Sequence, residues 1–90
     1  MTAPYRTTPV FDQVTLPAAL RAEHRTRDGV WGVIRVIEGR LRLTYVDEPG
    51  DAVVLDPATP GLINPRQTHF VEPLGQMRMQ VEFYDRQPDV

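Results

Sequence analysis

Apolar and polar residues alternate along several short stretches of the chain, and this alternation predicts β-strands. The clearest stretch is residues 30–46, VWGVIRVIEGRLRLTYV, which is rich in β-branched and aromatic residues. Its Glu38-Gly39 pair suits a tight turn, because glycine adopts a positive φ without steric cost. The pattern therefore predicts a hairpin in which residue 37 pairs with 40, 36 with 41, 34 with 43 and 32 with 45.

This hairpin is expected to have one apolar and one mixed face. The apolar face carries Gly32, Ile34, Val36, Leu41, Leu43 and Tyr45, and the mixed face carries Trp31, Val33, Arg35, Ile37, Arg40, Arg42, Thr44 and Val46. Arg35 and Arg42 would then lie opposite each other, which is unfavourable without an acidic neighbour. Glu82, on the polar face of the last strand, is expected to compensate both arginines.

Turn-forming residues divide the rest of the chain into further short segments. The chain has nine prolines and six glycines. We expect strands near residues 8–14, 21–26, 52–56, 62–64, 68–73 and 77–85, with a turn or a single helical turn at 17–20. Seven to nine short strands separated by turns are typical of an antiparallel β-sandwich or barrel. The sequence thus predicts one all-β domain over residues 1–90, with its core at about 8–86.

The small size raises the question of what stabilises the domain. A chain of 90 residues buries a modest share of its surface, so small domains often rely on disulfides, a metal or a partner subunit. The absence of cysteine excludes disulfides, thiolate zinc sites and cysteine nucleophiles. A bound metal and a homodimer remain, and we expect a homodimer.

Charge and hydropathy exclude two classes of partner. The formal net charge is −2, and neither sign forms a long block, so the chain lacks the basic face of a nucleic-acid-binding protein. No apolar run approaches the ~20 residues that a membrane span needs. The N-terminal MTAPYRTTPV lacks the apolar core of a signal peptide. We therefore expect a cytoplasmic protein without nucleic-acid or membrane partners.

Three motifs together resemble the TehB/YeaR-like domain family, of the tellurite-resistance protein B type. They are EHRTRDGVWGVIRVIEGRLRL at 23–43, PGLINPRQTHFVEP at 60–73 and MQVEFYD at 79–85. The resemblance implies a small cupin-like β-sandwich, or jelly roll, that holds a metal between two histidine-bearing strands. It also implies a role in a bacterial stress response involving oxyanions or reactive species. Some relatives also carry a methyltransferase domain, and we do not expect a methyltransferase activity in the present 90 residues.

The same resemblance places His24 and His69 at the first and last metal-ligand positions. Thr26 stands where a second histidine belongs, and the Trp31-Gly32 region where a glutamate would be. Half of the usual ligand set is therefore replaced. Imidazole nitrogen suits zinc, iron, nickel or copper, and two histidines need at least one further donor.

Glu72 is our first choice for that donor, because it follows His69 by three residues and precedes Pro73. The alternative is that strand alternation turns Glu72 to the opposite face, in a surface ion pair. Gln80 is a second choice as an oxygen donor. Thr26, Trp31 and Gln80 are expected to line the pocket beside the histidines.

Two further interpretations remain open. Arg35, Arg40 and Arg42 could bind a small anionic or oxyanion ligand, since guanidinium groups present forked donors, or they could form a solvated sheet face. The chain shows no nucleophile constellation and no phosphate-binding loop, so no catalytic residue is assigned. The alternative to a metal-binding protein is a non-catalytic small-ligand-binding or interaction module, which could be an accessory partner of a separate methyltransferase.

Overall fold

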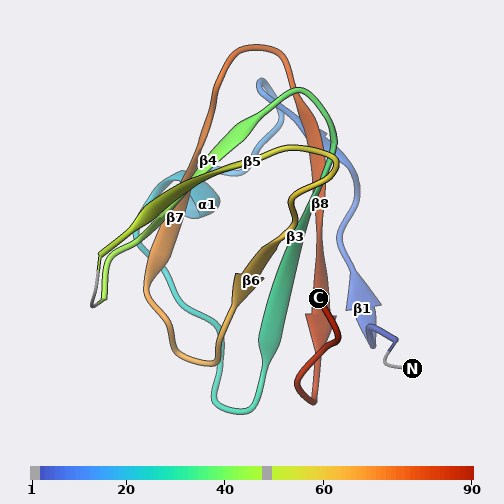
Figure 1. The fold of residues 1–90 in the computed structure, drawn as a ribbon, viewed down its shortest axis with the longest axis vertical. Helices are drawn as coiled ribbons and strands as arrows, with labels where there is room; N and C mark the ends of the chain where they lie inside the picture. Colours follow the sequence, from blue (N-terminus) through green and yellow to red (C-terminus); the bar gives the residue numbers. More distant parts are fainter. Residues whose placement is uncertain (1–2, 48–49) are drawn as a thin grey trace.

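The computed structural model describes residues 3–47 and 50–90, which fold into two facing antiparallel sheets (Figure 1). The larger sheet has the order β1-β8-β3-β6, with β2 also paired to β8, and the smaller sheet has the order β5-β4-β7. The prediction of an all-β antiparallel sandwich is confirmed. The elements are β1 (Arg6–Thr7), β2 (Phe11–Asp12), α1 (Ala18–Arg21), β3 (Trp31–Glu38), β4 (Leu41–Tyr45), β5 (Ala52–Leu55), β6 (Gly61–Ile63), β7 (His69–Pro73) and β8 (Arg78–Tyr84).

The predicted hairpin at residues 30–46 is wrong. β3 pairs with β8 and β6, whereas β4 pairs with β5 and β7. The turn at Gly39, whose φ is 76°, therefore carries the chain from one sheet to the other. Alternation identifies the buried face of each strand but not its neighbour. Both strands turn their apolar faces to one core, from opposite sheets.

The apolar faces themselves were predicted correctly. Ile34 and Val36 of β3 face Leu41 and Leu43 of β4 across the core, and all four are buried. Val33 departs from the prediction: it lies on the other side of β3 yet is fully buried. The core cluster comprises Leu16, Ile34, Val36, Leu41, Leu43, Leu55, Ile63, Val71, Met77, Met79 and Val81.

Separation of β3 and β4 also separates Arg35 from Arg42, so the predicted like-charge pair does not form. Arg35 Nε lies 3.0 Å from Glu82 Oε1, as expected for compensation by that glutamate. Arg42 belongs to the smaller sheet, and its Nη1 lies 4.0 Å from Glu72 Oε1. Each arginine thus has an acidic partner within its own sheet.

The segment between α1 and β3 is mostly irregular. α1 confirms the helical turn expected near residues 17–20. The strand expected at 21–26 reduces to a single bridge, between His24 and His69 of β7. Between α1 and β3 this segment forms no long element of its own, and it follows the mouth of the sandwich. In the described part of the chain, no helix is long and apolar enough to cross a membrane.

Candidate functional site

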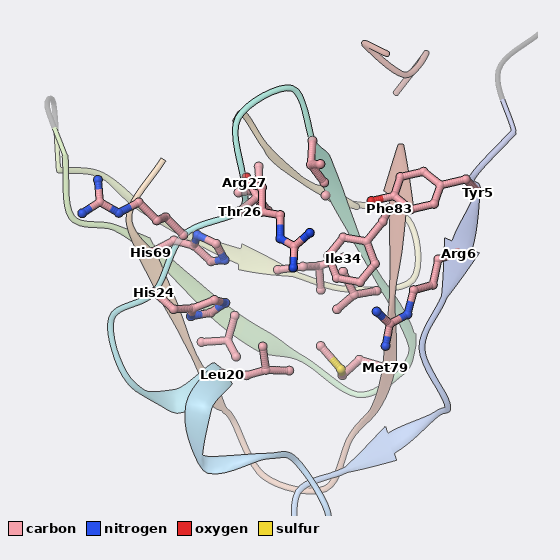
Figure 2. A pocket seen from close by; sticks show the side chains of 16 residues that line it. Tyr5, Arg6, Leu20, His24, Thr26, Arg27, Ile34, His69, Met79 and Phe83 are labelled. Atoms are coloured by element: carbon pink, nitrogen blue, oxygen red, sulfur yellow. The ribbon is translucent and has the colours of Figure 1, made fainter. Parts of the chain in front are cut away.

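A pocket of about 420 Å³ opens between the two sheets. Its apolar wall comes mainly from the inner face of the larger sheet, and the smaller sheet contributes two residues of β7. Helix α1 adds Leu20, and the segment before β3 forms part of the rim (Figure 2). The lining residues are Tyr5, Arg6, Leu20, His24, Arg25, Thr26, Arg27, Val30, Gly32, Ile34, Ile63, His69, Val71, Met79, Val81 and Phe83.

The two histidines of the chain meet in this pocket. The amide N–H of His24 donates to the carbonyl of His69 at 3.0 Å, and the reverse bond measures 2.9 Å. Residues that exchange both bonds in an antiparallel pair project their side chains to the same side. The ring centroids accordingly lie 4.2 Å apart, with the planes inclined at 55°. The structure thus joins residues that are 45 positions apart in the sequence.

Both imidazole rings are oriented by main-chain carbonyl groups. Nδ1 of His24 lies 3.0 Å from the carbonyl oxygen of Ala22, and Nδ1 of His69 lies 2.8 Å from that of Gln67. Burial lowers the pKa of His69; the Gln67 carbonyl acts in the opposite direction, and the charge on His24 lowers this pKa further. His69 is therefore held in its neutral form more strongly than a free histidine.

Thr26 fixes the rim of the pocket. Its hydroxyl donates to the carbonyl of Asn64 at 3.3 Å and accepts the amide N–H of Arg66 at 3.2 Å. Arg66 has a φ of 63°, a left-handed conformation that few non-glycine residues adopt. These contacts tie the segment that carries His24 to the turn before His69.

The rim carries positive charge. Arg6, Arg25 and Arg27 line the pocket and are exposed, and no aspartate or glutamate is among the lining residues. The Arg6 guanidinium carbon lies 5.9 Å from the centroid of the Phe83 ring, a cation–π distance. This concentration of positive charge occurs on a chain whose formal net charge is −2.

The polar groups occupy separate parts of the pocket. Figure 2 shows the histidine pair on one side and Arg6 on the other, with apolar residues between them. Arg27 extends toward the middle of the pocket from the segment that also carries Thr26. A molecule held here would contact imidazole nitrogen at one end, the guanidinium groups of Arg27 and Arg6 in the middle and at the other end, and hydrocarbon along its body.

Three of the predicted site residues lie elsewhere. Glu72 is on the outer face of β7, beside Arg42, with its side chain 49% exposed. Trp31 and Gln80 lie on the outer face of the larger sheet, where Trp31 pairs with Tyr84. None of the three is a lining residue. Among residues 3–47 and 50–90, no group of three histidine, aspartate or glutamate side chains could hold a metal ion.

Sequence reasoning missed the arginines of the rim and singled out three others. Arg35, Arg40 and Arg42 are not among the lining residues. Arg6 reaches the pocket because β1 pairs with β8, a relationship with no local sequence signal. Gly32 gave a usable signal, since a glycine inside an apolar strand often marks close approach of a ligand or another chain segment.

A profile of the TehB-like domain matches residues 6–81 of the chain. The probable S-adenosyl-L-methionine-dependent methyltransferase TehB of Haemophilus influenzae is 29% identical over 90 residues, which cover 94% of this chain and 32% of that protein. The crystal structure of TehB from H. influenzae superposes with a TM-score of 0.81 at 28% identity, over 90% of this chain and 30% of that one. The chain thus spans about a third of these relatives.

A further solved structure shares the fold over nearly its whole length. It is a protein from Escherichia coli strain K12, with a TM-score of 0.83 at 16% identity, and the match covers 97% of this chain and 93% of that one. The profile match takes in both pocket histidines and most of the sandwich. The chain belongs to the TehB-like domain family.

Proposed function

We propose that this domain binds a small organic anion in the pocket between its sheets. The observation that carries the proposal is the charge of the lining: three arginines, two histidines and no carboxylate, around an otherwise largely apolar wall. Guanidinium groups present forked donors that suit carboxylates and other oxyanions. Ligand pockets generally combine an apolar lining with a few polar groups that fix orientation.

The volume of the pocket favours an organic ligand over a bare oxyanion. A space of about 420 Å³ lies within the range that small-molecule sites occupy. An oxyanion such as tellurite would fill roughly 100 Å³ or less, on the scale of ~30 Å³ for each water molecule in the liquid. Such an ion could meet the arginines but would leave most of the apolar wall uncovered.

Gly32 supports the proposal and provides a way to test it. It lies in the interior of β3 and lines the pocket. A Cβ atom there would lie 3.5 Å from Cβ of Ile63 and 3.8 Å from Cγ2 of Thr26, which are ordinary van der Waals contacts. A Gly32→Val substitution should therefore find room for its Cβ and fill part of the pocket with its methyl groups, and valine suits a strand.

The test is a fluorescence titration with two probes of similar shape. The first, 8-anilinonaphthalene-1-sulfonate, is anionic, and the second, N-phenyl-1-naphthylamine, is neutral. We expect wild type to bind the anionic probe more tightly. Gly32→Val should weaken both probes, whereas an Arg6→Gln/Arg27→Gln double variant should weaken only the anionic one.

Arg40→Gln is the matched control, because Arg40 is exposed and lies outside the pocket lining. It should bind both probes like wild type, and circular dichroism should show that every variant remains folded. Equal binding of the anionic probe by wild type and by folded Gly32→Val would contradict the proposal. Mass spectrometry of molecules released from denatured wild type would then identify any ligand retained during purification.

A divalent metal is a second candidate ligand, favoured by the orientation of the histidine rings. Metal-binding histidines usually donate their second N–H to a carbonyl or carboxylate, and both rings make such a contact through Nδ1. The donor set nevertheless does not fit a complete cupin-type site, because Glu72 and Gln80 lie on outer faces. Zinc, iron, nickel or copper would need further donors from outside these residues.

The family suggests a setting for the binding domain. The matched relatives are named as probable methyltransferases, and we propose that the pocket serves a methyltransferase system within a tellurite-resistance or stress response. Two observations support this proposal: membership of the family and a binding pocket without an assigned nucleophile. Affinity purification of the tagged chain from its own cells should recover a methyltransferase, and Gly32→Val should leave that association intact.

A further inference from the structure

We propose that the ligand is a hydroxylated organic acid, whose hydroxyl group donates a hydrogen bond to the imidazole pair of His24 and His69. Its carboxylate would lie near Arg6 at the other end of the pocket, on the side toward which Arg27 extends from the rim. This inference rests on the proposed function and adds the class of ligand. Three features of the pocket carry it: the tautomers of the rings, the accessibility of their outer nitrogens and the absence of acid from the lining.

The tautomer that each ring adopts when it is neutral follows from its main-chain contact. A carbonyl oxygen only accepts hydrogen bonds, so Nδ1 of His24 must donate to Ala22 and Nδ1 of His69 must donate to Gln67. A neutral imidazole carries one proton, and the proton is therefore on Nδ1 in both rings. Nε2 of each ring is left with a lone pair. The structure thus presents two hydrogen-bond acceptors on rings whose centroids are 4.2 Å apart.

These acceptors face the pocket. His69 is only 4% exposed, yet in the described part of the chain no side-chain nitrogen or oxygen is both buried and without a partner. The hydrogen bond recorded for its ring is the one made by Nδ1. Nε2 of His69 therefore keeps its accessible surface on the side of the pocket, which both rings line.

The charge of the lining decides which kind of donor fits. An ammonium group could also donate to Nε2, but three arginines and no carboxylate line the pocket. A cation placed there would be repelled by the rim and would find no acidic partner. A neutral donor avoids this repulsion. Burying a hydroxyl group also costs little free energy, provided that the group donates a hydrogen bond to an acceptor such as Nε2.

The spatial order of the groups then sets the shape of the ligand. Arg6 lies on the opposite side of the pocket from the histidine pair, and Ile34 and Met79 lie between them (Figure 2). A single molecule that reaches both ends must carry its acid and its hydroxyl at opposite ends of an apolar body. Aryl and straight-chain ω-hydroxy acids meet this requirement, whereas α-hydroxy acids do not.

Isothermal titration calorimetry with matched pairs of acids tests the inference. One pair is 4-hydroxyphenylacetate and phenylacetate, and the other is 6-hydroxyhexanoate and hexanoate. We expect wild type to prefer at least one hydroxy acid over its partner by about threefold to tenfold, the effect of one net hydrogen bond. His24→Phe should abolish this preference, so that the two members of a pair bind with equal affinity.

Arg27→Gln provides the complementary variant. It should weaken both members of a pair by the same factor and so preserve the preference for the hydroxyl group. His24 is the residue to replace first, because it is only half-buried, whereas His69 is buried. His24→Leu replaces His24→Phe if the latter does not fold, since it also removes the acceptor.

The outcomes separate this inference from the proposed function. If both members of each pair bind equally and Gly32→Val weakens them, the pocket binds anions but the hydroxyl assignment is wrong. If folded His24→Phe and folded His69→Phe both still prefer the hydroxy acid, the assignment of the histidine pair as the hydroxyl acceptor is also wrong. Tighter binding of 6-aminohexanoate than of 6-hydroxyhexanoate would show that the donor is cationic. If none of the acids binds wild type, the proposed function fails as well.

Discussion

His24 and His69 exchange both main-chain hydrogen bonds, at 3.0 and 2.9 Å, across the mouth of the sandwich. This pairing holds the centroids of the two rings 4.2 Å apart. Their Nδ1 atoms face main-chain carbonyls of their own segments. Ring position and ring orientation are thus fixed separately, the first by the bridge and the second by local contacts.

Stability should fall as the pH drops below neutrality, because His69 resists protonation in the folded state. Burial lowers its folded-state pKa, so between that value and the ordinary histidine pKa of 6.5 the unfolded chain binds more protons. The free energy of unfolding then rises with pH in this window. The stabilisation that comes from neutral His69 is complete above pH 6.5 and is lost progressively below it. The free energy of unfolding changes by at most about 1.4 kcal/mol per pH unit in this window.

Urea unfolding between pH 5.5 and 7.5 measures this slope. His69→Gln removes the titrating group and should flatten the profile relative to wild type. His24→Gln should retain most of the slope, because burial rather than the neighbouring charge is the main cause of the lowered pKa. Identical slopes for wild type and His69→Gln would contradict the assignment.

The comparison of sequence and structure shows what alternation can and cannot predict. Strand faces follow from period-2 patterns, and the burial of Ile34, Val36, Leu41 and Leu43 was predictable for that reason. The pairing partners of β3 and β4 were not, because the Glu38-Gly39 turn is compatible with a hairpin and with a crossing between sheets. Gly39 contributes the same positive φ in either case.

The candidate site was predictable only in part. The family resemblance placed His24 and His69 together, which composition and spacing alone could not do. Glu72 was chosen for its distance along the chain from His69, but strand alternation puts a residue three positions away on the opposite face. The arginines of the rim come from segments far apart in sequence, and only the pairing of β1 with β8 brings Arg6 to the pocket.

Gly39 should be intolerant of any side chain. A Cβ atom there would overlap the carbonyl oxygen of Gln76 and lie 2.8 Å from Cα of Met77, both main-chain atoms that cannot move aside easily. Gly75 also has a positive φ, of 90°, but has open space around it. We expect Gly75→Ala to cost about 1–2 kcal/mol from backbone conformation alone, and Gly39→Ala to cost ~3 kcal/mol or more. Equal losses of unfolding free energy in Gly39→Ala and Gly75→Ala, measured with urea, would show that the turn at Gly39 relaxes to accommodate the side chain.

The Arg35–Glu82 and Arg42–Glu72 pairs should contribute unequally to stability. Arg35 and Glu82 are joined at 3.0 Å, with side chains 40% and 18% exposed, and the hydroxyl of Tyr84 also donates to Glu82 at 2.9 Å. Arg42 and Glu72 are 4.0 Å apart and about half exposed. Double-mutant cycles with glutamine should give a coupling of about 1 kcal/mol for the first pair and below ~0.5 kcal/mol for the second. The reverse order would contradict this ranking.

The edge of the smaller sheet is where we propose that a second copy pairs. β5 is one of the two edge strands of that sheet as described, and its Val53 and Val54 are 37% and 43% exposed. Exposed apolar edge strands favour pairing with another chain. Light scattering after size exclusion should show a dimer for wild type and a monomer for Val54→Lys. Thr44→Lys, on the neighbouring strand, is the control; a monomeric wild type would refute the proposal.

Metal binding, where it occurs, should depend on the histidines and not on Glu72. The two rings lie close enough to share an ion, while Glu72 points away beside Arg42. Two nitrogen donors make a weak site, so Zn²⁺ titrated into chelator-free protein should bind with micromolar or weaker affinity and less tightly at low pH, where protons compete for Nε2. His69→Gln should abolish binding in calorimetry and in metal analysis by mass spectrometry. Glu72→Gln should bind Zn²⁺ like wild type, and a loss of affinity in that variant would show that the carboxylate turns inward to complete the site.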